Sequence, residues 1–303
     1  MPMIDLECCE GEQKNVALHQ MKRWVPRHGM LVWGGCAGEA LVMPKTIRAL
    51  ERGLQVLDAL RANRILPLQD LHRETRIPKP TLLRILQTLD RAGLVSRRLA
   101  DGHYRLSTQT GVGRKRDQYD RVAEAAAPVL FRLCEKVKWP SDLFVPAGNC
   151  MECRETSRPY SPFALPTLPE RVGVRVGWLM TGVGHAYLAW CPEKEREKIL
   201  RRLQKSNNAQ DWLTHEPKRL DRILKDVRRR GYATREPGYV SCRYDALPRD
   251  DGLAAIAVAL SDGRRVHGAM NILWIKKAFT AEEFAAQHLA DLQDAAREIV
   301  GLL

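Results

Sequence analysis

One stretch of the chain, residues 65–106, constrains the fold more than any other: ILPLQDLHRETRIPKPTLLRILQTLDRAGLVSRRLADGHYRL. Apolar residues at helical spacing predict a short helix near Leu68 and a second helix over residues 81–89. Ile77-Pro78 separates them, because proline lacks a backbone donor and disfavours helix in the residue before it. Asp101-Gly102 then predicts a hairpin. Helix, turn, helix and basic hairpin together are typical of a winged helix-turn-helix, a DNA-reading unit.

The net charge of the chain is +13, and most of this excess lies around the same stretch. Between Lys45 and Arg116, sixteen Lys and Arg residues stand against six Asp and Glu residues. Such an uneven distribution is expected of a domain that binds a polyanion, and a double-stranded DNA operator is the predicted partner. The alternative interpretation is a solvated basic face without a partner.

The second helix of this unit is the predicted reader of base edges in the major groove, which it contacts through its N-terminal part. Lys79, Thr81, Leu82 and Arg84 stand there. Arg84 suits either a base or a phosphate, and Leu82 suits either a thymine methyl group or the core. The basic residues of the hairpin are expected to contact phosphate or the adjacent minor groove, namely Arg97, Arg98 and Arg105.

The chain is long enough for two domains, and its patterns predict four segments. These are a poorly ordered extension (1–42), a winged helix-turn-helix domain (43–108), a linker with a linker helix (109–138) and an effector-binding domain (139–303). The extension shows neither helical nor strand periodicity. One hypothesis is that translation of the native protein starts at Met43, which an intact-mass measurement would decide.

After Trp139 the pattern changes to short apolar strands that alternate with helices. Strands are predicted over residues 142–146, 151–156, 253–260 and 266–274. Helices are predicted over residues 179–189, 193–203, 218–231 and 281–301. A sheet flanked by helices gives an α+β domain of a size that holds one small ligand.

Several other functions lack a supporting pattern. No stretch has the roughly 18 uncharged apolar residues of a membrane span, and eight cysteines in a chain of 303 residues do not form a disulfide scaffold, so a cytoplasmic protein with reduced thiols is expected. Cys150 and Cys153 form a CxxC without the second ligand pair that zinc needs. Because no nucleophile, base or phosphate loop stands in a catalytic arrangement, we expect neither an enzyme nor a cofactor or metal site.

Three segments carry a resemblance to a known family. IPKPTLLRILQTLDRAGLV resembles the recognition segment of IclR-type bacterial transcription regulators. GWLMTGVGHAYLAWCP resembles their ligand-loop and helix segment, and GLAAIAVALSDGRRVHGAMNILW resembles their paired effector-domain strands. The resemblance runs from about Lys45 to the end of the chain, and Pro80 departs from it, since the family usually has a small hydroxyl residue there.

The resemblance implies a winged head, a linker helix and a GAF-like effector domain in a homodimer or tetramer. It implies an effector pocket formed by Trp178, Met180, Thr181, Gly182, Val183, Ala254, Asn271 and Leu273. Asn271 is the expected partner of a ligand carboxylate or hydroxyl, while Ala254 and Leu273 suit the core equally well. Arg175 and Arg235 are further candidates for a carboxylate, or are surface charges.

Shorter segments, WPSDLFVP, RETSRPYSPF and YLAWCPEKER, are most similar to regulators of 3-(3-hydroxyphenyl)propionate catabolism. This similarity implies an activator of a catabolic operon that responds to an aromatic carboxylate, with RNA polymerase as a further candidate partner. The competing hypothesis is an enzyme or ligand-binding protein whose basic N-terminal domain docks on a partner.

Overall fold

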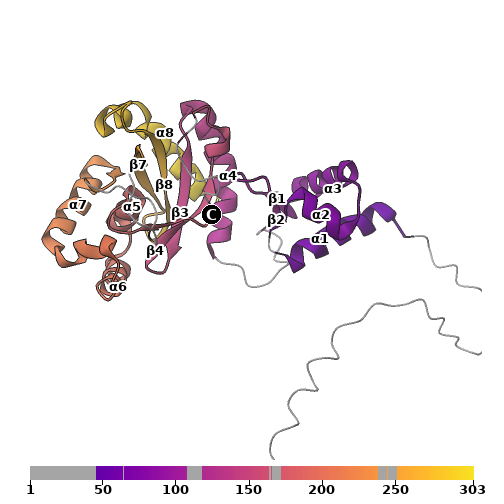
Figure 1. Cartoon of the computed structure of the whole chain (residues 1–303), viewed down its shortest axis with the longest axis horizontal. Helices are drawn as coiled ribbons and strands as arrows, with labels where there is room; N and C mark the ends of the chain where they lie inside the picture. The colour runs from indigo at the N-terminus through magenta and orange to yellow at the C-terminus, as the bar shows by residue number, and fades with distance from the viewer. Residues whose placement is uncertain are drawn as a thin grey trace, which may run out of the picture. The chain divides into compact units, whose positions relative to one another are not determined.

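The computed structural model describes most of the chain after residue 45 (Figure 1). The described residues are 46–63, 65–107, 118–163, 165, 172–237, 244 and 251–303. The predicted extension over residues 1–42 and the basic linker over residues 111–116 lie outside them.

Residues 47–107, the head, form a winged helix-turn-helix. Three helices, α1 (Arg48–Ala62), α2 (Leu68–Thr75) and α3 (Lys79–Arg91), precede the antiparallel hairpin of β1 (Val95–Arg97) and β2 (Tyr104–Leu106). Apolar side chains from all five elements share one core. The predicted order of helix, turn, helix and hairpin is therefore confirmed.

Local chemistry explains the turn between α2 and α3. Arg76 adopts a left-handed conformation with φ of 55° and ends α2, while the Thr75 hydroxyl donates to the Leu71 carbonyl at 2.6 Å. Pro80 lies in the first turn of α3, where a missing N–H removes no helical hydrogen bond. The departure from the family pattern at Pro80 is thus compatible with the start of this helix.

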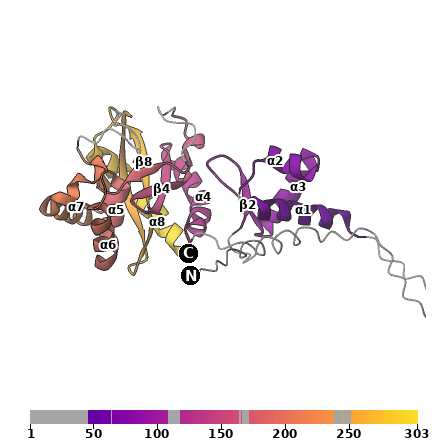
Figure 2. The same cartoon turned by 60° about the horizontal axis from the view of Figure 1, so that its bottom comes forward.

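Residues 118–303, the body, are built on an antiparallel sheet that contains β4 and β8 (Figure 2). The sheet has six strands in the order β5-β4-β3-β8-β7-β6. The strands are β3 (Ser141–Ala147), β4 (Cys150–Thr156), β5 (Arg175–Gly177), β6 (Ala233–Thr234), β7 (Leu253–Ser261) and β8 (Val266–Ile275). The long β7–β8 pair and β3 form its centre, which follows from their nearly continuous apolar sequences.

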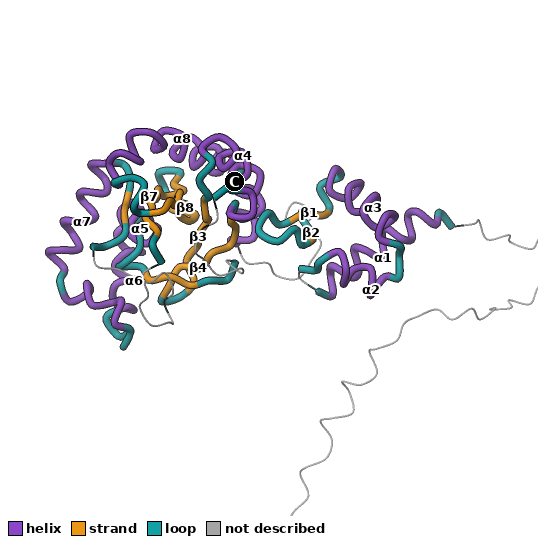
Figure 3. The backbone as a smooth tube through the Cα atoms, turned by 45° about the horizontal axis from the view of Figure 1, so that its top comes forward, coloured by secondary structure: helices purple, strands orange, loops and turns teal. Residues whose placement is uncertain are grey.

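Helices cover both sides of this sheet (Figure 3). On one side lie α4 (Gln118–Val137) and α8 (Ala281–Gly301), whose core includes Trp139, Trp274 and Phe284. We call this the α4/α8 face. On the other side lie α5 (Gly182–Trp190), α6 (Glu193–Leu203) and α7 (Pro217–Arg230), with Trp178 and Tyr187 in their core. We call this the α5 face.

The largest difference from the predicted elements is at α5, which begins at Gly182 instead of residue 179. The Thr181 hydroxyl accepts a hydrogen bond from Gly184 N at 3.2 Å and so caps the helix three residues later than apolar periodicity suggests. A Cβ at Gly184 would overlap the Trp178 carbonyl, so glycine is required for this close approach. Strands β5 and β6 were not predicted, because three and two residues are too short to show alternation.

Among the described helices, none is both long enough and apolar enough to cross a membrane.

Candidate DNA interface and effector site

The N-terminal half of α3 presents cationic side chains to solvent. Lys79 and Arg84 are exposed and form no ion pair with a described residue, and Thr81 is half-buried. Leu82, in contrast, is fully buried in the head core. It has no surface left for a thymine methyl group, so its role is packing and its assignment as a DNA contact is withdrawn.

Leu83 is the apolar residue that α3 does expose, at 45 %. Sequence reasoning missed it, although helical phase carried the signal. Leu82 and Leu86 are four residues apart and are both buried, so they lie on the same side of α3. Leu83 therefore points away from the head core. Gln87 lies one turn after Leu83 and is also exposed, so apolar and amide groups accompany the cations on this surface.

The three hairpin arginines differ in their surroundings. Arg97 is exposed, and its Nε donates to the Gly102 carbonyl at 3.1 Å. Arg98 forms an ion pair with Asp101. Arg105 is only 8 % exposed, and its Nε donates to Ser96 Oγ at 3.2 Å. Of the three predicted phosphate contacts, Arg97 has the required exposure, whereas Arg98 is neutralised and Arg105 is buried.

The tip of the hairpin contacts the body through Glu155, the penultimate residue of β4. Its fully buried carboxylate accepts hydrogen bonds from Ala100 N at 2.9 Å and Leu99 N at 3.3 Å. The Leu99 side chain packs against the core of the α4/α8 face. At the other end of the hairpin, Ser107 Oγ donates to Glu124 Oε1 of α4 at 2.6 Å. Polar and apolar contacts therefore connect the hairpin to the body.

The environment of Glu155 changes its protonation. Burial raises its pKa to about 7, against the opposing field of Arg105 and hydrogen bonds from Ala100, Thr156 and Leu99. Desolvation penalises the charged form more than these donors stabilise it. The contact between hairpin and body therefore contains a carboxyl group that titrates near neutral pH.

On the α5 face, strand register aligns five residues in a row across the sheet. Ala233 pairs with Ala257, which pairs with Asn271; Asn271 pairs with Asp142, and Asp142 pairs with Thr156. Directly opposed residues on neighbouring strands share a face. The row therefore runs from two alanines to three polar residues, and Asn271 was the only member predicted as a site residue.

The α5 start packs on the alanine end of this row. A Cβ at Gly182 would lie 3.3 Å from Ala257 Cβ and 3.2 Å from the Ala233 carbonyl, so glycine permits this contact. Met180 and Val183 lie in the adjoining core, and Thr181 serves as the cap described above.

The remaining predicted effector residues separate between the two faces. Trp178 is fully buried on the α5 face, where its Nε1 donates to the Gly148 carbonyl at 3.3 Å. Leu273, two residues after Asn271 on β8, points to the same face. Ala254 packs against the core of the α4/α8 face. Its assignment to the same site as Asn271 is wrong, because neighbouring strand residues point to opposite faces and the register places Ala255, not Ala254, beside Leu273.

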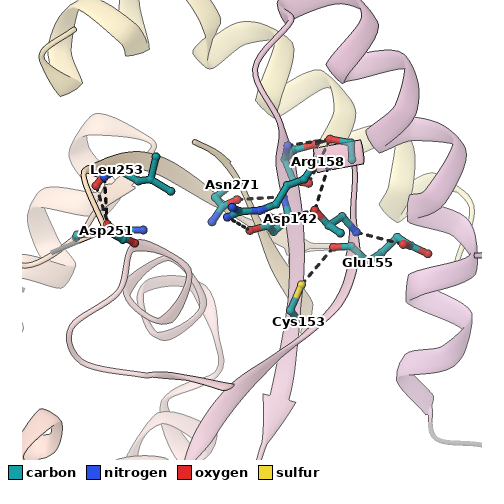
Figure 4. Close-up of polar contacts among 11 residues, drawn as sticks. Asp142, Cys153, Glu155, Arg158, Asp251, Leu253 and Asn271 are labelled. Atoms are coloured by element: carbon teal, nitrogen blue, oxygen red, sulfur yellow. Dashed lines mark hydrogen bonds and ion pairs between the residues drawn. The ribbon is translucent and has the colours of Figure 1, made fainter. Parts of the chain in front are cut away.

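At the polar end of the row, Asp142 has no exposed surface and is fully hydrogen-bonded (Figure 4). Arg158 donates to it in a forked geometry, with Nε to Oδ1 at 3.1 Å and Nη2 to Oδ2 at 2.9 Å. The Thr156 hydroxyl donates to Oδ1 at 2.6 Å, and Asp142 N donates to Asn271 Oδ1 at 3.1 Å. Asp142 and Arg158 were missed, although the segments WPSDLFVP and RETSRPYSPF contain them.

The other predicted carboxylate partners are already engaged. Arg235 Nη1 donates to Asp251 Oδ1 at 2.7 Å and to the Leu253 carbonyl at 3.0 Å. Arg175 is largely exposed and lies 3.4 Å from Glu152. Neither adds a free cation to the row on the α5 face.

The four thiols among the described residues do not form a reactive centre. Cys150 and Cys153 are buried, and burial raises the pKa of Cys191 to about 12. A raised pKa keeps a thiol protonated and weakly nucleophilic. Within the described ranges, no group of three or more His, Cys, Asp and Glu residues is arranged to hold a metal ion.

A winged helix-turn-helix with an exposed cationic helix, followed by an α/β body, defines a DNA-binding regulator with an effector-binding domain. Residues 49–99 match the IclR helix-turn-helix domain, and residues 119–300 match the domain described as bacterial transcriptional regulator IclR C-terminal. The chain belongs to the IclR family of transcriptional regulators.

Solved structures of similar proteins include IclR from Thermotoga maritima, with 21 % identity, a TM-score of 0.47, and coverage of 83 % of this chain and 97 % of that one. A regulator of the family from Brucella abortus has 20 % identity, a TM-score of 0.46, and coverage of 86 % and 94 %. An IclR homolog from Microbacterium hydrocarbonoxydans, complexed with 4-hydroxybenzoate, has 22 % identity, a TM-score of 0.46, and coverage of 84 % and 98 %.

Glu155→Gln is expected to change the pH dependence of stability. The folded pKa of about 7 lies above the ordinary value of 4.5, so the protonated carboxyl contributes stability below pH 4.5 that is lost as the pH rises to about 7. Because glutamine does not titrate, the wild type should lose free energy of unfolding relative to the variant across this window. Urea unfolding at several pH values measures the difference.

Glu135→Gln, at an exposed position of α4, is the matched control and should give a constant difference. A difference that is equally constant for Glu155→Gln would contradict the raised pKa of Glu155.

Proposed function

We propose that this regulator activates a catabolic operon in response to an aromatic carboxylate. The observation that carries the proposal is the row on the α5 face, where the buried cation Arg158 bonds Asp142 and the apolar Ala257 and Leu273 flank the neighbouring Asn271. An aromatic acid requires an apolar surface for its ring and a cationic group for its carboxylate. The segments similar to regulators of 3-(3-hydroxyphenyl)propionate catabolism support both the aromatic effector and activation.

In this proposal α3 reads the operator. Arg84 forks onto a guanine, Lys79 contacts guanine or phosphate, and Thr81 contacts the DNA beside them. Leu83 replaces Leu82 as the apolar contact, because Leu83 is the exposed residue of the two. Arg97 of the hairpin contacts phosphate and positions the head without specifying sequence.

Two heads bind one operator in this proposal, and α1 supplies the contact between two copies of the chain. Ile47, Leu50 and Leu54 are 69 %, 59 % and 50 % exposed, and their spacing places them on one side of the helix. An apolar stripe on a surface element favours burial against a partner. A dimer of heads fits the two half-sites that dimeric helix-turn-helix proteins recognise.

The Glu155 contact is the proposed route from effector to head. Thr156 bonds Asp142 in the row on the α5 face, and the preceding residue, Glu155, bonds the hairpin tip. An effector changes DNA binding only if it binds two arrangements of the protein unequally. A shift of β4 at Thr156 would alter the hydrogen bonds of Glu155, and thereby the position of the hairpin on the body.

Arg84→Ala is expected to weaken binding to the operator by about 1–3 kcal/mol while binding to random DNA changes little, because a base contact is lost. Gel-shift titrations against both DNAs at two salt concentrations measure this discrimination. Arg201→Ala, at an exposed position of α6, is the control that should affect neither DNA. Equal losses on both DNAs would make Arg84 a phosphate contact. Wild-type binding without sequence preference or steep salt dependence would contradict operator recognition and favour docking on another partner.

Leu50→Glu combined with Leu54→Glu should disrupt the paired heads, since it introduces charges into the apolar stripe. The preference for an operator with two half-sites over one with a single half-site should fall by about tenfold or more, because the second head no longer binds as part of one unit. Gln55→Glu adds one charge at an exposed polar position of the same helix and is the control. An unchanged preference in the double variant would show that α1 does not join the heads.

Glu155→Gln should also uncouple the effector from DNA binding. The glutamine amide can accept one backbone hydrogen bond, but its NH2 group opposes the second donor. The ratio of operator affinities with and without effector should approach one, and effector-dependent run-off transcription by RNA polymerase should fall with it. Calorimetry should show that the effector still binds. A full response in this variant, equal to that of Glu135→Gln, would exclude Glu155 from the route.

A further inference from the structure

Arg158 has a hydrogen-bond donor that no described residue accepts. Its side chain is 10 % exposed, and Nε and Nη2 are both engaged by Asp142. Nη1 is buried and lacks a hydrogen-bond partner within the described structure. A guanidinium remains charged at all relevant pH values, and a buried donor without a partner destabilises the folded protein. Such an arrangement is expected where a ligand supplies the missing acceptor.

Asn271, which pairs with Asp142 across the sheet, supplies a second donor that no described residue accepts. Its Oδ1 accepts from Asp142 N, which fixes the orientation of the amide and leaves Nδ2 as a donor. Asn271 is 6 % exposed, and none of the described residues accepts from Nδ2. Figure 4 shows Arg158 and Asn271 together at Asp142, so both donors belong to one polar cluster on the α5 face.

We infer that Arg158 Nη1 and Asn271 Nδ2 form the anchor for the carboxylate of the effector, one donor for each carboxylate oxygen. This assignment rests on the proposed role of the α5 face as the effector site. It names two specificity-determining residues, only one of which sequence reasoning had considered.

Charge favours a monoanion at this anchor. The charges of Arg158 and Asp142 offset each other, so these two described residues supply no excess positive charge to balance a phosphate dianion. The N-terminus of α5 packs on Ala257, the neighbour of Asn271 in the row, and adds the partial positive charge of a helix start. A carboxylate matches two neighbouring N–H donors and a weakly positive environment.

Competing cations on the body are less suitable. Arg235 is bound by Asp251 and the Leu253 carbonyl, and Arg175 is exposed beside Glu152. An anion at either would displace an existing partner or remain in water, where an ion pair contributes little. Arg158 differs because its free donor is buried and its charge is already compensated.

The test measures binding of benzoate, phenylacetate and phenylpropionate, each beside its uncharged primary amide, to the full chain by calorimetry. Wild type should prefer at least one acid over its amide by about tenfold to hundredfold, the range for a hydrogen bond to a charged group. Arg158→Lys keeps a cation for Asp142 but removes the forked donors, and should abolish this preference. Asn271→Asp keeps the acceptor for Asp142 N but opposes the acid with a like charge, and should weaken acid binding more than amide binding.

Arg175→Lys is the control and should retain the wild-type preference. Melting temperature establishes that each variant is folded, and Asn271→Asp tests the anchor independently if Arg158→Lys is unstable. Wild type that binds an acid and its amide equally overturns the anchor but leaves a ligand-binding body. Retention of the preference in Arg158→Lys and Asn271→Asp overturns the assignment of these residues. If none of the acids binds wild type, both the anchor and the proposed aromatic acid effector are wrong.

Discussion

The buried carboxylate of Asp142 is the constraint on which the α5 face of the body depends. Its side chain has no exposed surface, and an ion removed from water costs several kcal/mol unless other groups compensate it. Thr156 and the fork of Arg158 provide that compensation, and the Asp142 backbone in turn orients Asn271. Asp142 therefore connects three other elements, which are the end of β4, the middle of β8 and the 3-10 helix Arg158–Tyr160. Removal of any partner would leave a buried group unsatisfied.

The same strand connects this charge to the head, because β4 alternates between faces. Thr156 points to the α5 face and bonds Asp142, whereas Glu155 pairs with Leu143 on the α4/α8 face and bonds the hairpin tip. Two adjacent residues thus contact the proposed effector site and the DNA-binding domain. A rigid strand transmits a displacement over one residue without a long chain of intermediates. This short distance is the physical basis of the proposed coupling between the two domains through β4.

The sequence predicted those features that depend on local chemistry. Proline at the turn, the Asp101-Gly102 hairpin and the apolar strands of β7 and β8 all follow from residue types and their spacing. Features that depend on packing were not predicted. The helical phase of Leu82 and Leu86 indicates that Leu83 points away from the head core, but its 45 % exposure beside the cations of α3 becomes visible only in the folded head. Arg105 and Asp142 are ordinary charged residues in sequence, and the opposite charges nearest to them in the fold, Glu155 and Arg158, lie about 50 and 16 residues away in the chain.

The distribution of paired and unpaired cations separates the two proposed functions of the protein. On α3, Lys79 and Arg84 are exposed, and none of the described carboxylates pairs with them to compete with a polyanion. In the body, Asp142 compensates the charge of Arg158, so a highly charged anion gains little binding free energy there. A small acid with an apolar ring gains a hydrogen bond for its carboxylate and burial for its ring. The basic excess of the head attracts DNA over a long range, but screening confines the influence of Arg158 to its immediate neighbours. In this proposal the head attracts DNA over a long range, because its exposed cations have no described carboxylate beside them. The body selects a small acid at short range, because Asp142 compensates the charge of Arg158.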